Sequence, residues 1–250
     1  MRRSVCLMIG LALVCCLATV VSPAMATTWD ASAGYPTSYT NPNGVWSYGY
    51  KTAFNGTFSP YAFEEYTGDG LYQFHSPPSG YDITKGWIAK NPASTPLLAG
   101  NYYAANGIDM HPGSAGEATT IRWTSPINGT VDVSATWAIY SGWGAPAGWI
   151  AWNDTPWFVV SMLGNGVPGS ESDPGVTGWP YAGSYNAALP VNVGTTIDIM
   201  VDWGPDNNWG GDCTGITFSI SQVPEPSSLA ALGVGAMSLL GLVWRRKRSS

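Results

Sequence analysis

The stretch TVDVSATWAIY at residues 130–140 indicates the fold class, because apolar and polar side chains alternate along it without a break. The members of its apolar set are Val131, Val133, Ala135, Trp137 and Ile139. Successive side chains of a β-strand point to opposite faces, so this set shares one face of a sheet. The stretch therefore predicts a long strand with one face in a hydrophobic core.

Three shorter segments repeat this alternation, at residues 121–123, 197–203 and 216–220. Turn residues such as Gly, Pro and Asn recur between them, and strong helix formers are scarce in the same region. We therefore expect an all-β domain, in which two antiparallel sheets pack face to face as a jelly-roll-like sandwich.

Asn128-Gly129 stands between two of the alternating segments. The Asn-Gly pair favours the tight turn of a β-hairpin. The sequence therefore predicts that the strands on either side, at residues 121–125 and 130–140, are neighbours in one sheet.

The first 26 residues have the three parts of a secretory signal peptide. Arg2 and Arg3 form a basic start, and residues 5–21 form an apolar segment. Ala-Met-Ala at residues 24–26 then offers small residues for cleavage after the last alanine. Removal of this peptide leaves residues 27–223 as one exported domain, long enough for a substantial core.

The exported region is strongly acidic. It holds four basic and fifteen acidic residues, so its formal charge is −11, compared with −6 for the whole chain. Such a surface repels phosphate backbones, and we expect no nucleic-acid partner. Cys213 is the one cysteine of this region, so it has no partner there for a disulfide and is expected to be a small buried residue.

The other end of the chain predicts a single membrane-spanning helix. Residues 229–244 contain no charge, and as a helix they would be about 24 Å long, slightly short of a hydrocarbon core. A basic cluster follows directly and consists of Arg245, Arg246, Lys247 and Arg248. Basic residues stay on the cytoplasmic side, so this cluster is expected to stop the helix in the membrane with the domain outside.

Pro224, Glu225 and Pro226 precede the apolar segment and the basic cluster. In this order, the three features resemble the PEP-CTERM sorting signal of bacterial exported proteins, over residues 224–250. The resemblance implies an exosortase-type membrane enzyme that cuts near the Pro-Glu-Pro and leaves the protein at the cell surface or outside the cell. A permanent single-span anchor, with the proline-rich stretch as a stiff spacer, stays open as the alternative.

Three stretches of the middle region are similar to a recurrent exported bacterial β-sandwich domain that often carries a PEP-CTERM tail. They are NPNGVWSYGY at residues 41–50, MHPGSAGEATTIRWTSPINGTVDV at 110–133 and GDCTGITFSIS at 211–221. This resemblance implies the sandwich fold and export, and it implies no particular chemistry.

Tryptophan is frequent, and one group falls in a Gly- and Pro-rich region where loops would expose the rings. The group consists of Trp143, Trp149, Trp152, Trp157 and Trp179. Exposed indole rings stack on the C–H faces of sugars, so the group is a candidate site for extracellular polysaccharide. By contrast, Trp123, Trp137 and Trp203 continue the alternating segments, and we expect them in the core.

The segment DWGPDNNWGGD at residues 202–212 carries candidate metal ligands. Asp202, Asp206 and Asp212 offer carboxylate oxygens at short intervals, as a Ca²⁺ site requires, although the spacing differs from that of an EF-hand. Asp and Asn are also typical of a solvated turn, so both interpretations stay open.

Candidate catalytic residues are few. Glu64 and Glu65 could each belong to a glycosidase pair, but adjacent strand residues face opposite ways and cannot form that pair together. His75 and His111 are distant in sequence, and His111 is expected to be a structural hydrogen-bonding residue. We expect a non-enzymatic protein of the cell envelope or extracellular matrix, with a carbohydrate-binding module and a glycoside-acting enzyme as alternatives.

Overall fold

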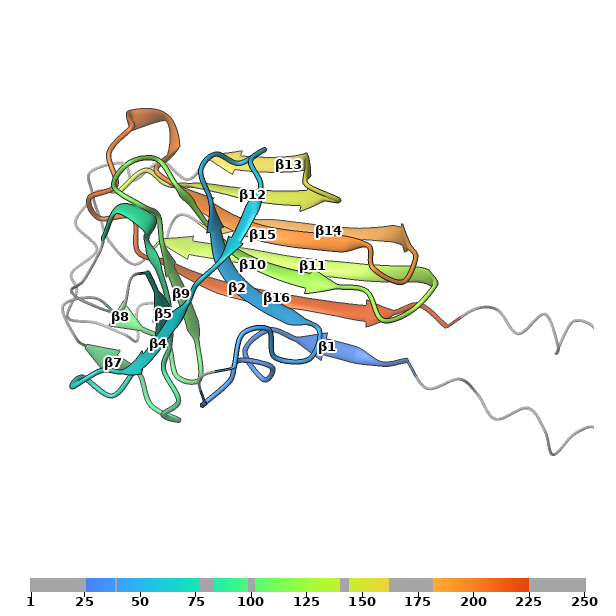
Figure 1. Cartoon of the computed structure of the whole chain (residues 1–250), viewed down its shortest axis with the longest axis horizontal. Coiled ribbons are helices and arrows are strands. Elements are labelled where there is room, and N and C mark those ends of the chain that lie inside the picture. Colours follow the sequence, from blue (N-terminus) through green and yellow to red (C-terminus); the bar gives the residue numbers. More distant parts are fainter. Residues whose placement is uncertain are drawn as a thin grey trace, which may run out of the picture. The chain divides into compact units, whose positions relative to one another are not determined.

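The computed structural model describes residues 26–38, 40–76, 83–98, 102–139, 144–161 and 182–224 (Figure 1). The chain divides into a compact unit, Thr28–Ser221, and a second unit made of Met1–Thr27 and Gln222–Ser250. Residues 1–25 of the predicted signal peptide and the predicted helix at 229–244 lie outside the described residues. Within the described ranges, no helix has the length and apolarity needed to cross a membrane.

The larger of two antiparallel sheets has eight strands. Its order is β14 (Ala182–Val191), β11 (Gly129–Ile139), β16 (Thr214–Gln222), β9 (Ile108–His111), β6 (Trp87–Lys90), β5 (Tyr72–His75) and β4 (Phe63–Tyr66). The eighth strand, β1 (Thr28–Asp30), pairs with the end of β16, with Thr28 opposite Ser221. Strand β16 therefore has β11 along one edge and both β9 and β1 along the other.

The second sheet has six strands. Its order is β13 (Thr155–Ser161), β12 (Ala147–Trp152), β15 (Thr196–Asp202), β10 (Ala118–Thr124), β2 (Trp46–Lys51) and β3 (Phe58–Pro60). A small hairpin, β7 (Leu97–Leu98) with β8 (Tyr102–Tyr103), and two short 3₁₀ turns, η1 (Ile83–Lys85) and η2 (Gly204–Asp206), complete the described elements. The all-β class and the two antiparallel sheets confirm the prediction.

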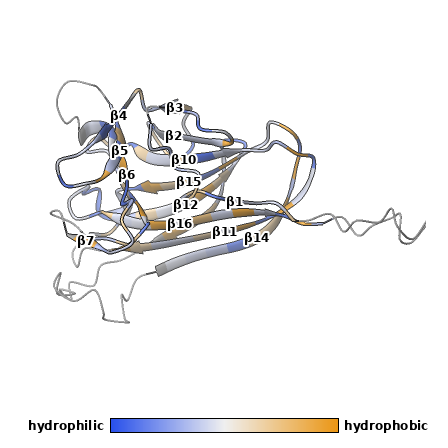
Figure 2. Ribbon diagram, turned by 90° about the horizontal axis from the view of Figure 1, so that it is seen from below, coloured by the Kyte–Doolittle hydropathy of each residue, from blue (hydrophilic) through white to orange (hydrophobic). Residues whose placement is uncertain are grey.

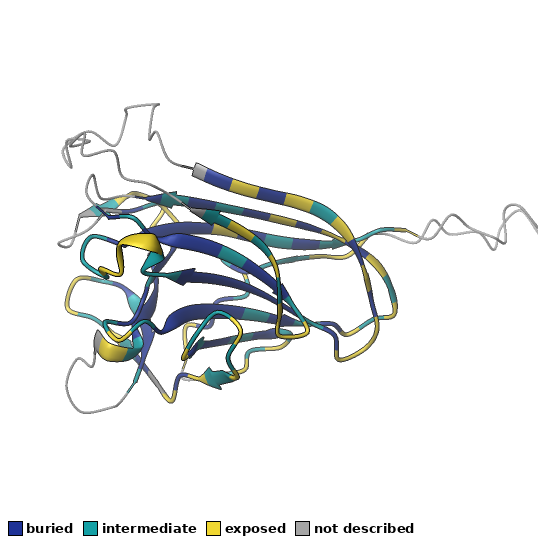
Figure 3. Ribbon diagram, turned by 90° about the horizontal axis from the view of Figure 1, so that it is seen from above, coloured by how far each residue is buried: buried dark blue, intermediate teal, exposed yellow. Residues whose placement is uncertain are grey.

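The main core lies between the two sheets. The apolar set of β11 is fully buried, whereas Asp132 and Ser134 between its members are exposed, as the alternation predicted. Figure 3 shows buried and exposed residues alternating along a long strand of the sandwich. Figure 2 shows hydrophobic residues along β11, β15 and β16. The Trp137 indole N–H of the larger sheet donates to the Met200 carbonyl of the six-stranded sheet at 3.2 Å. Aromatic pairs cross the same interface, including Tyr48 stacked on Phe74 with centroids 4.9 Å apart.

The predicted hairpin at Asn128-Gly129 is wrong. Strand β10 pairs with β2 and β15, whereas β11 pairs with β14, so the turn carries the chain from one sheet to the other. Two strands with one apolar face each can bury those faces across a sandwich as well as side by side. The end of β10 is instead tied to the β14–β15 turn, where Ser125 N–H donates to the Thr195 carbonyl at 2.8 Å.

The predicted core position of Trp203 is also wrong. Strand β15 ends at Asp202, and Gly204 adopts φ +63°, which turns the chain into η2. Alternation predicts which side chains are buried only within a strand. The apolar residue that follows the strand therefore lies outside the core. Trp203 is therefore half-buried on the other side of the sheet, where the candidate site lies.

Candidate functional site

The outer face of the six-stranded sheet is partly buried, although it points away from the main core. Asp198 and Met200 of β15 are fully buried there, and so is Lys51 at the end of β2. In the strand register, Asp198 lies opposite Arg122 of β10, and Met200 lies opposite Trp149 of β12. Two features share this face, a cluster of charges and an aromatic groove.

The charged cluster consists of Lys51, Arg122, Asp154 and Asp198. Lys51 Nζ lies 2.8 Å from both Asp154 Oδ1 and Asp198 Oδ2. Arg122 donates two hydrogen bonds to Asp198, from Nε at 2.8 Å and from the guanidinium nitrogen Nη2 at 2.9 Å, and it also contacts Asp154. Partial burial would raise the pKa of Asp154, but the two cations lower it below its usual value.

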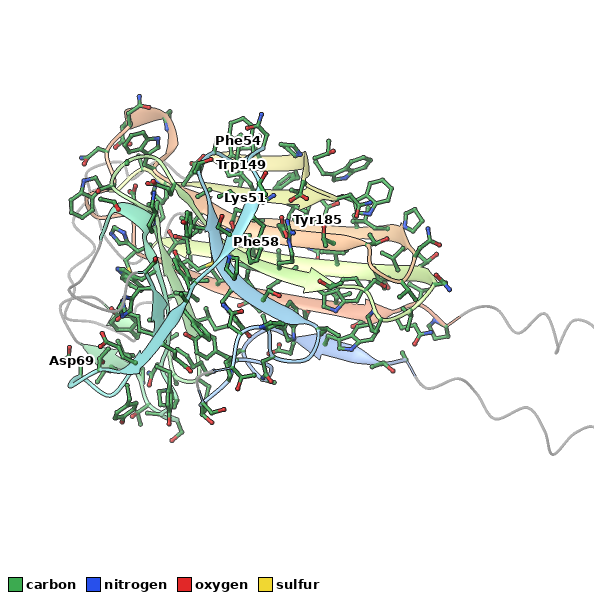
Figure 4. The ribbon with its side chains drawn as sticks, viewed as in Figure 1. Lys51, Phe54, Phe58, Asp69, Trp149 and Tyr185 are labelled. Atoms are coloured by element: carbon green, nitrogen blue, oxygen red, sulfur yellow. The ribbon has the colours of Figure 1, made fainter. Side chains whose placement is uncertain are left out.

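A loop at residues 52–57 begins directly after Lys51 and folds over this face (Figure 4). It carries Phe54, whose ring is parallel to that of Trp149 at a centroid distance of 4.2 Å. At the other end of the loop, the Phe58 ring lies 4.4 Å from the guanidinium carbon of Arg122. The charged cluster therefore fixes both ends of the loop that presents Phe54.

Beside the Phe54–Trp149 pair lies a groove of about 540 Å³, which we call the aromatic groove. Its lining includes the rings of Phe54, Trp149 and Trp203 together with Val159 and Asp202. Gly116 allows Trp203 to lie close to the sheet, because a Cβ at that position would come within 2.7 Å of the indole ring. Most of these side chains are held by strands or by the turn that ends β15.

Asp202 orients the Trp149 ring. Its Oδ2 accepts a hydrogen bond from Trp149 Nε1 at 2.9 Å, and its Oδ1 accepts one from the Gly204 backbone N–H at 2.9 Å. Burial raises the pKa of Asp202 above its usual range, while these N–H donors act in the opposite direction. The carboxylate is thus a structural part of the groove wall.

The predicted tryptophan group is divided by the structure. Trp149 lines the aromatic groove, whereas Trp152 packs against the main core and meets Trp157 edge to face at 5.9 Å. Trp157 is 56% exposed and lies outside the groove lining. Trp143 and Trp179 fall outside the described residues. Phe54, Val159 and the position of Trp203 in the groove were not predicted from the sequence, although Gly204-Pro205 was an available signal for Trp203.

Each of the three predicted metal ligands accepts a hydrogen bond from a backbone N–H. Besides Asp202, Asp206 Oδ1 accepts from Asn208 N–H at 3.2 Å, and Asp212 Oδ1 accepts from Ala145 N–H at 2.9 Å. Across the part of the chain that the structure describes, no group of three His, Cys, Asp or Glu side chains could hold a metal ion.

The predicted roles of other polar residues can be compared with their surroundings. Glu64 is buried while Glu65 reaches His75 at 3.4 Å, so the two glutamates do face opposite ways. His111 Nδ1 lies 2.9 Å from the Pro112 carbonyl and its ring stacks on Trp87, so the residue has the hydrogen-bond partner that the prediction requires. Cys213 is buried, as expected, and burial raises its pKa well above the usual value.

Two buried carboxyls predict a stability that depends on pH. Burial raises the pKa of Glu64, which is 3% exposed and has no hydrogen-bond partner, to about 7. Burial also raises the pKa of Asp212 to about 8. A group with a raised pKa in the folded state favours folding at low pH, and that contribution is lost as pH rises. We expect the melting temperature to fall between about pH 5 and pH 8.

Thermal denaturation across this range measures the effect. Glu64→Gln should match the wild type at the acidic end and exceed it at the alkaline end, because glutamine stays neutral. Asp69→Asn is the matched control at an exposed carboxylate and should leave the pH profile unchanged (Figure 4). A wild-type melting temperature that rises from pH 5 to pH 8 would contradict the assignment.

The C-terminal segment matches a known family. Residues 222–248 match the family model described as the PEP-CTERM protein-sorting motif. The chain carries a PEP-CTERM sorting motif. The match includes the predicted Pro224, Glu225 and Pro226, and it begins at Gln222, the last residue of β16. The PEP-CTERM motif supports export of the protein and implies processing by an exosortase.

A search of curated protein sequences returned no match. Among solved structures, the domain is similar to a CBM51 from Clostridium perfringens GH95 in complex with methyl-galactose. The identity is 10% and the TM-score 0.34, over 78% of this chain and 100% of that one. A CBM35 from Paenibacillus barcinonensis is 16% identical, with a TM-score of 0.27 over 77% of this chain and 97% of that one. An isomalto-dextranase of Arthrobacter globiformis T6 complexed with panose is 12% identical, with a TM-score of 0.28 over 79% and 23%.

Proposed function

We propose that the exported domain is a non-enzymatic carbohydrate-binding β-sandwich of the cell envelope or extracellular matrix. The observation that carries this proposal is the aromatic groove, where Phe54, Trp149 and Trp203 converge around few polar groups. Ligand sites are concave and mostly apolar, with a small number of placed polar atoms. Aromatic rings held by a rigid scaffold suit the flat C–H faces of sugars.

The groove favours carbohydrate binding without hydrolysis. Glycoside hydrolysis requires two carboxyl groups that flank the scissile bond. Among the residues that the structure describes, Asp202 is the one carboxylate in the groove lining, and its two oxygens accept hydrogen bonds from Trp149 and from Gly204. An enzyme would reveal itself by the release of reducing ends from a polysaccharide that the protein binds.

The first functional prediction concerns Trp149. Trp149→Ala should weaken binding to the preferred glycan at least tenfold, about 1.4 kcal/mol, because it removes one ring and releases the Phe54 that rests on it. Titration of the purified chain with polysaccharides selected on a glycan array measures the change. Trp157→Ala is the matched control, since Trp157 is exposed but lies outside the groove lining. Equal loss in both variants would place the sugar elsewhere.

The PEP-CTERM motif leads us to infer a membrane-held intermediate. Residues 229–244 would span the membrane, with the basic cluster at 245–248 in the cytoplasm and the β-sandwich outside. An exosortase would then cut near Pro224-Glu225-Pro226 and free the domain from the helix. Each proline restricts the preceding residue to extended backbone and offers no N–H, so the enzyme would meet an extended, unpaired strand.

The second functional prediction tests this processing. Changing Pro224, Glu225 and Pro226 together to alanine should leave membrane insertion intact and block release. Intact-mass measurement in a host that contains the exosortase distinguishes the processed chain from the full-length one. A wild-type chain that keeps residues 229–250 in that host would leave the permanent anchor as the remaining interpretation.

A further inference from the structure

Every basic residue of the exported region is engaged inside the domain. The sequence places four there, Lys51, Lys85, Lys90 and Arg122, and the structure describes all of them. Lys51 is fully buried and the Arg122 side chain is 14% exposed, and both are bound to Asp198 and Asp154 in the charged cluster.

The remaining two cations, Lys85 and Lys90, also interact with groups of the domain. Lys85 Nζ lies 2.7 Å from Glu117 Oε1, and it stands over the Tyr50 ring at 5.3 Å from the centroid. Lys90 is buried and donates to Ser32 Oγ and to the Asn106 carbonyl. None of the four basic residues, all of them in the described part of the chain, lines the aromatic groove.

The surroundings of the groove carry the opposite charge. Asp202 is part of its wall, and the exposed Asp206 follows within the same turn region. Asp212 is close enough to both for their charges to raise its pKa, in addition to the larger effect of its own burial. The indole N–H of Trp149, which could have donated to an anion, is already given to Asp202.

We propose that the aromatic groove accepts uncharged glycans and excludes those that carry carboxylate, sulfate or phosphate groups. This inference rests on the proposed carbohydrate-binding function and specifies its substrate class. A neutral sugar loses little binding free energy at an acidic wall, because stacking on aromatic rings requires no opposite charge. The negative group of an anionic sugar would be repelled by the carboxylates, and none of the four basic residues lines the groove to form an ion pair with it. Contacts between like charges disfavour binding of the wrong partner.

The test measures binding of the full chain, in detergent, to two immobilised sets of polymers. The neutral set is dextran, galactan, xylan and β-glucan, and the anionic set is dextran sulfate, alginate and polygalacturonate. We expect the best neutral polymer to bind at least about tenfold more tightly than any anionic one at low salt. An anionic polymer that binds as tightly as the best neutral one overturns this inference and leaves the proposed function intact. Binding to neither set overturns the proposed function, and this inference with it.

Salt gives a second, independent readout. Affinity for the neutral polymer should change less than about twofold between about 20 mM and 500 mM NaCl, because no ion pair is formed. Residual binding to dextran sulfate should become stronger with salt, since screening weakens the repulsion. Binding of dextran sulfate that weakens as salt rises would show a cation at the site and overturn the inference.

Two variants that each add one positive charge test whether the groove itself controls the selection. Val159→Lys adds a cation at the groove, where Val159 is 48% exposed, and should raise binding to dextran sulfate at least about fivefold. Val193→Lys adds the same charge at a residue that is 65% exposed and lies in the β14–β15 turn, away from the groove lining. Equal gains from both variants would mean that net charge, and not the groove, controls the selection.

Discussion

Replacement of Trp137 by alanine should lower the free energy of unfolding by about 3–5 kcal/mol, because large-to-small changes in a core leave a cavity. Trp137 is fully buried near the C-terminal end of β11, and its indole N–H donates to the Met200 carbonyl of the opposite sheet. A Cβ on Gly148 of β12 would lie within 2.8 Å of the same ring. The side chain therefore fills the space between the sheets and connects them, so neither sheet can relax to refill its volume.

Asp132→Ala is the control for Trp137→Ala. Asp132 lies on the same strand, is exposed and points to the opposite face, so its loss should change the free energy of unfolding by less than about 0.5 kcal/mol. Urea denaturation of both variants, followed by tryptophan fluorescence and circular dichroism, measures the difference. Equal destabilisation of the two variants would mean that the core face of β11 is assigned incorrectly.

A loss of similar size is expected when Asp198 is removed from the charged cluster. Asp198→Ala should cost about 3–5 kcal/mol, because the loss of one partner leaves a buried charge without compensation. Asp198 receives Lys51 on one oxygen and Arg122 on both, and Lys51 has no access to solvent. The remaining partner, Asp154, belongs to the β12–β13 turn and is too exposed to neutralise both cations.

Asp154→Ala is the matched control within the same cluster. Its side chain is 49% exposed, and exposed ion pairs contribute about 0–1 kcal/mol. Chemical denaturation at low and high salt compares the two variants. If Asp198→Ala costs no more than Asp154→Ala, Lys51 is hydrated in solution and the cluster does not fix the loop at residues 52–57.

The alternating segments allowed the class of the fold to be predicted, because their period is local and survives any arrangement of the sheets. The apolar members of these segments are buried, namely Val131, Val133, Ala135, Trp137 and Ile139 of β11, Ile121 and Trp123 of β10, and Ile216 and Phe218 of β16. Which strands are neighbours was not accessible in the same way. Asn128-Gly129 marks a reversal of the chain, but a reversal within one sheet and a crossing between two sheets use the same local residues.

Only the part of the candidate site that depends on a single residue could be predicted from the sequence. Trp149 was identified because it is aromatic and lies in a Gly- and Pro-rich region. Phe54 stacks on it from the loop that follows Lys51, and Lys51 is bound to Asp198 and Asp154, which lie far away in the sequence. Trp203 lines the groove because the strand ends one residue earlier than the apolar pattern does. Both facts depend on long-range packing, which no short pattern contains.

The central position of β16 determines how the domain responds to mechanical load. The PEP-CTERM motif begins at Gln222, the last residue of this strand. A pull on the tail along the strand would shear β16 against β11 on one edge and against β9 and β1 on the other, and many hydrogen bonds would have to break together. A pull that separates the two ends of the domain would instead peel β1 from β16 one pair at a time, starting at Thr28 and Ser221. A domain tethered by its tail alone would therefore keep its fold under traction that removes β1 from a domain held at both ends.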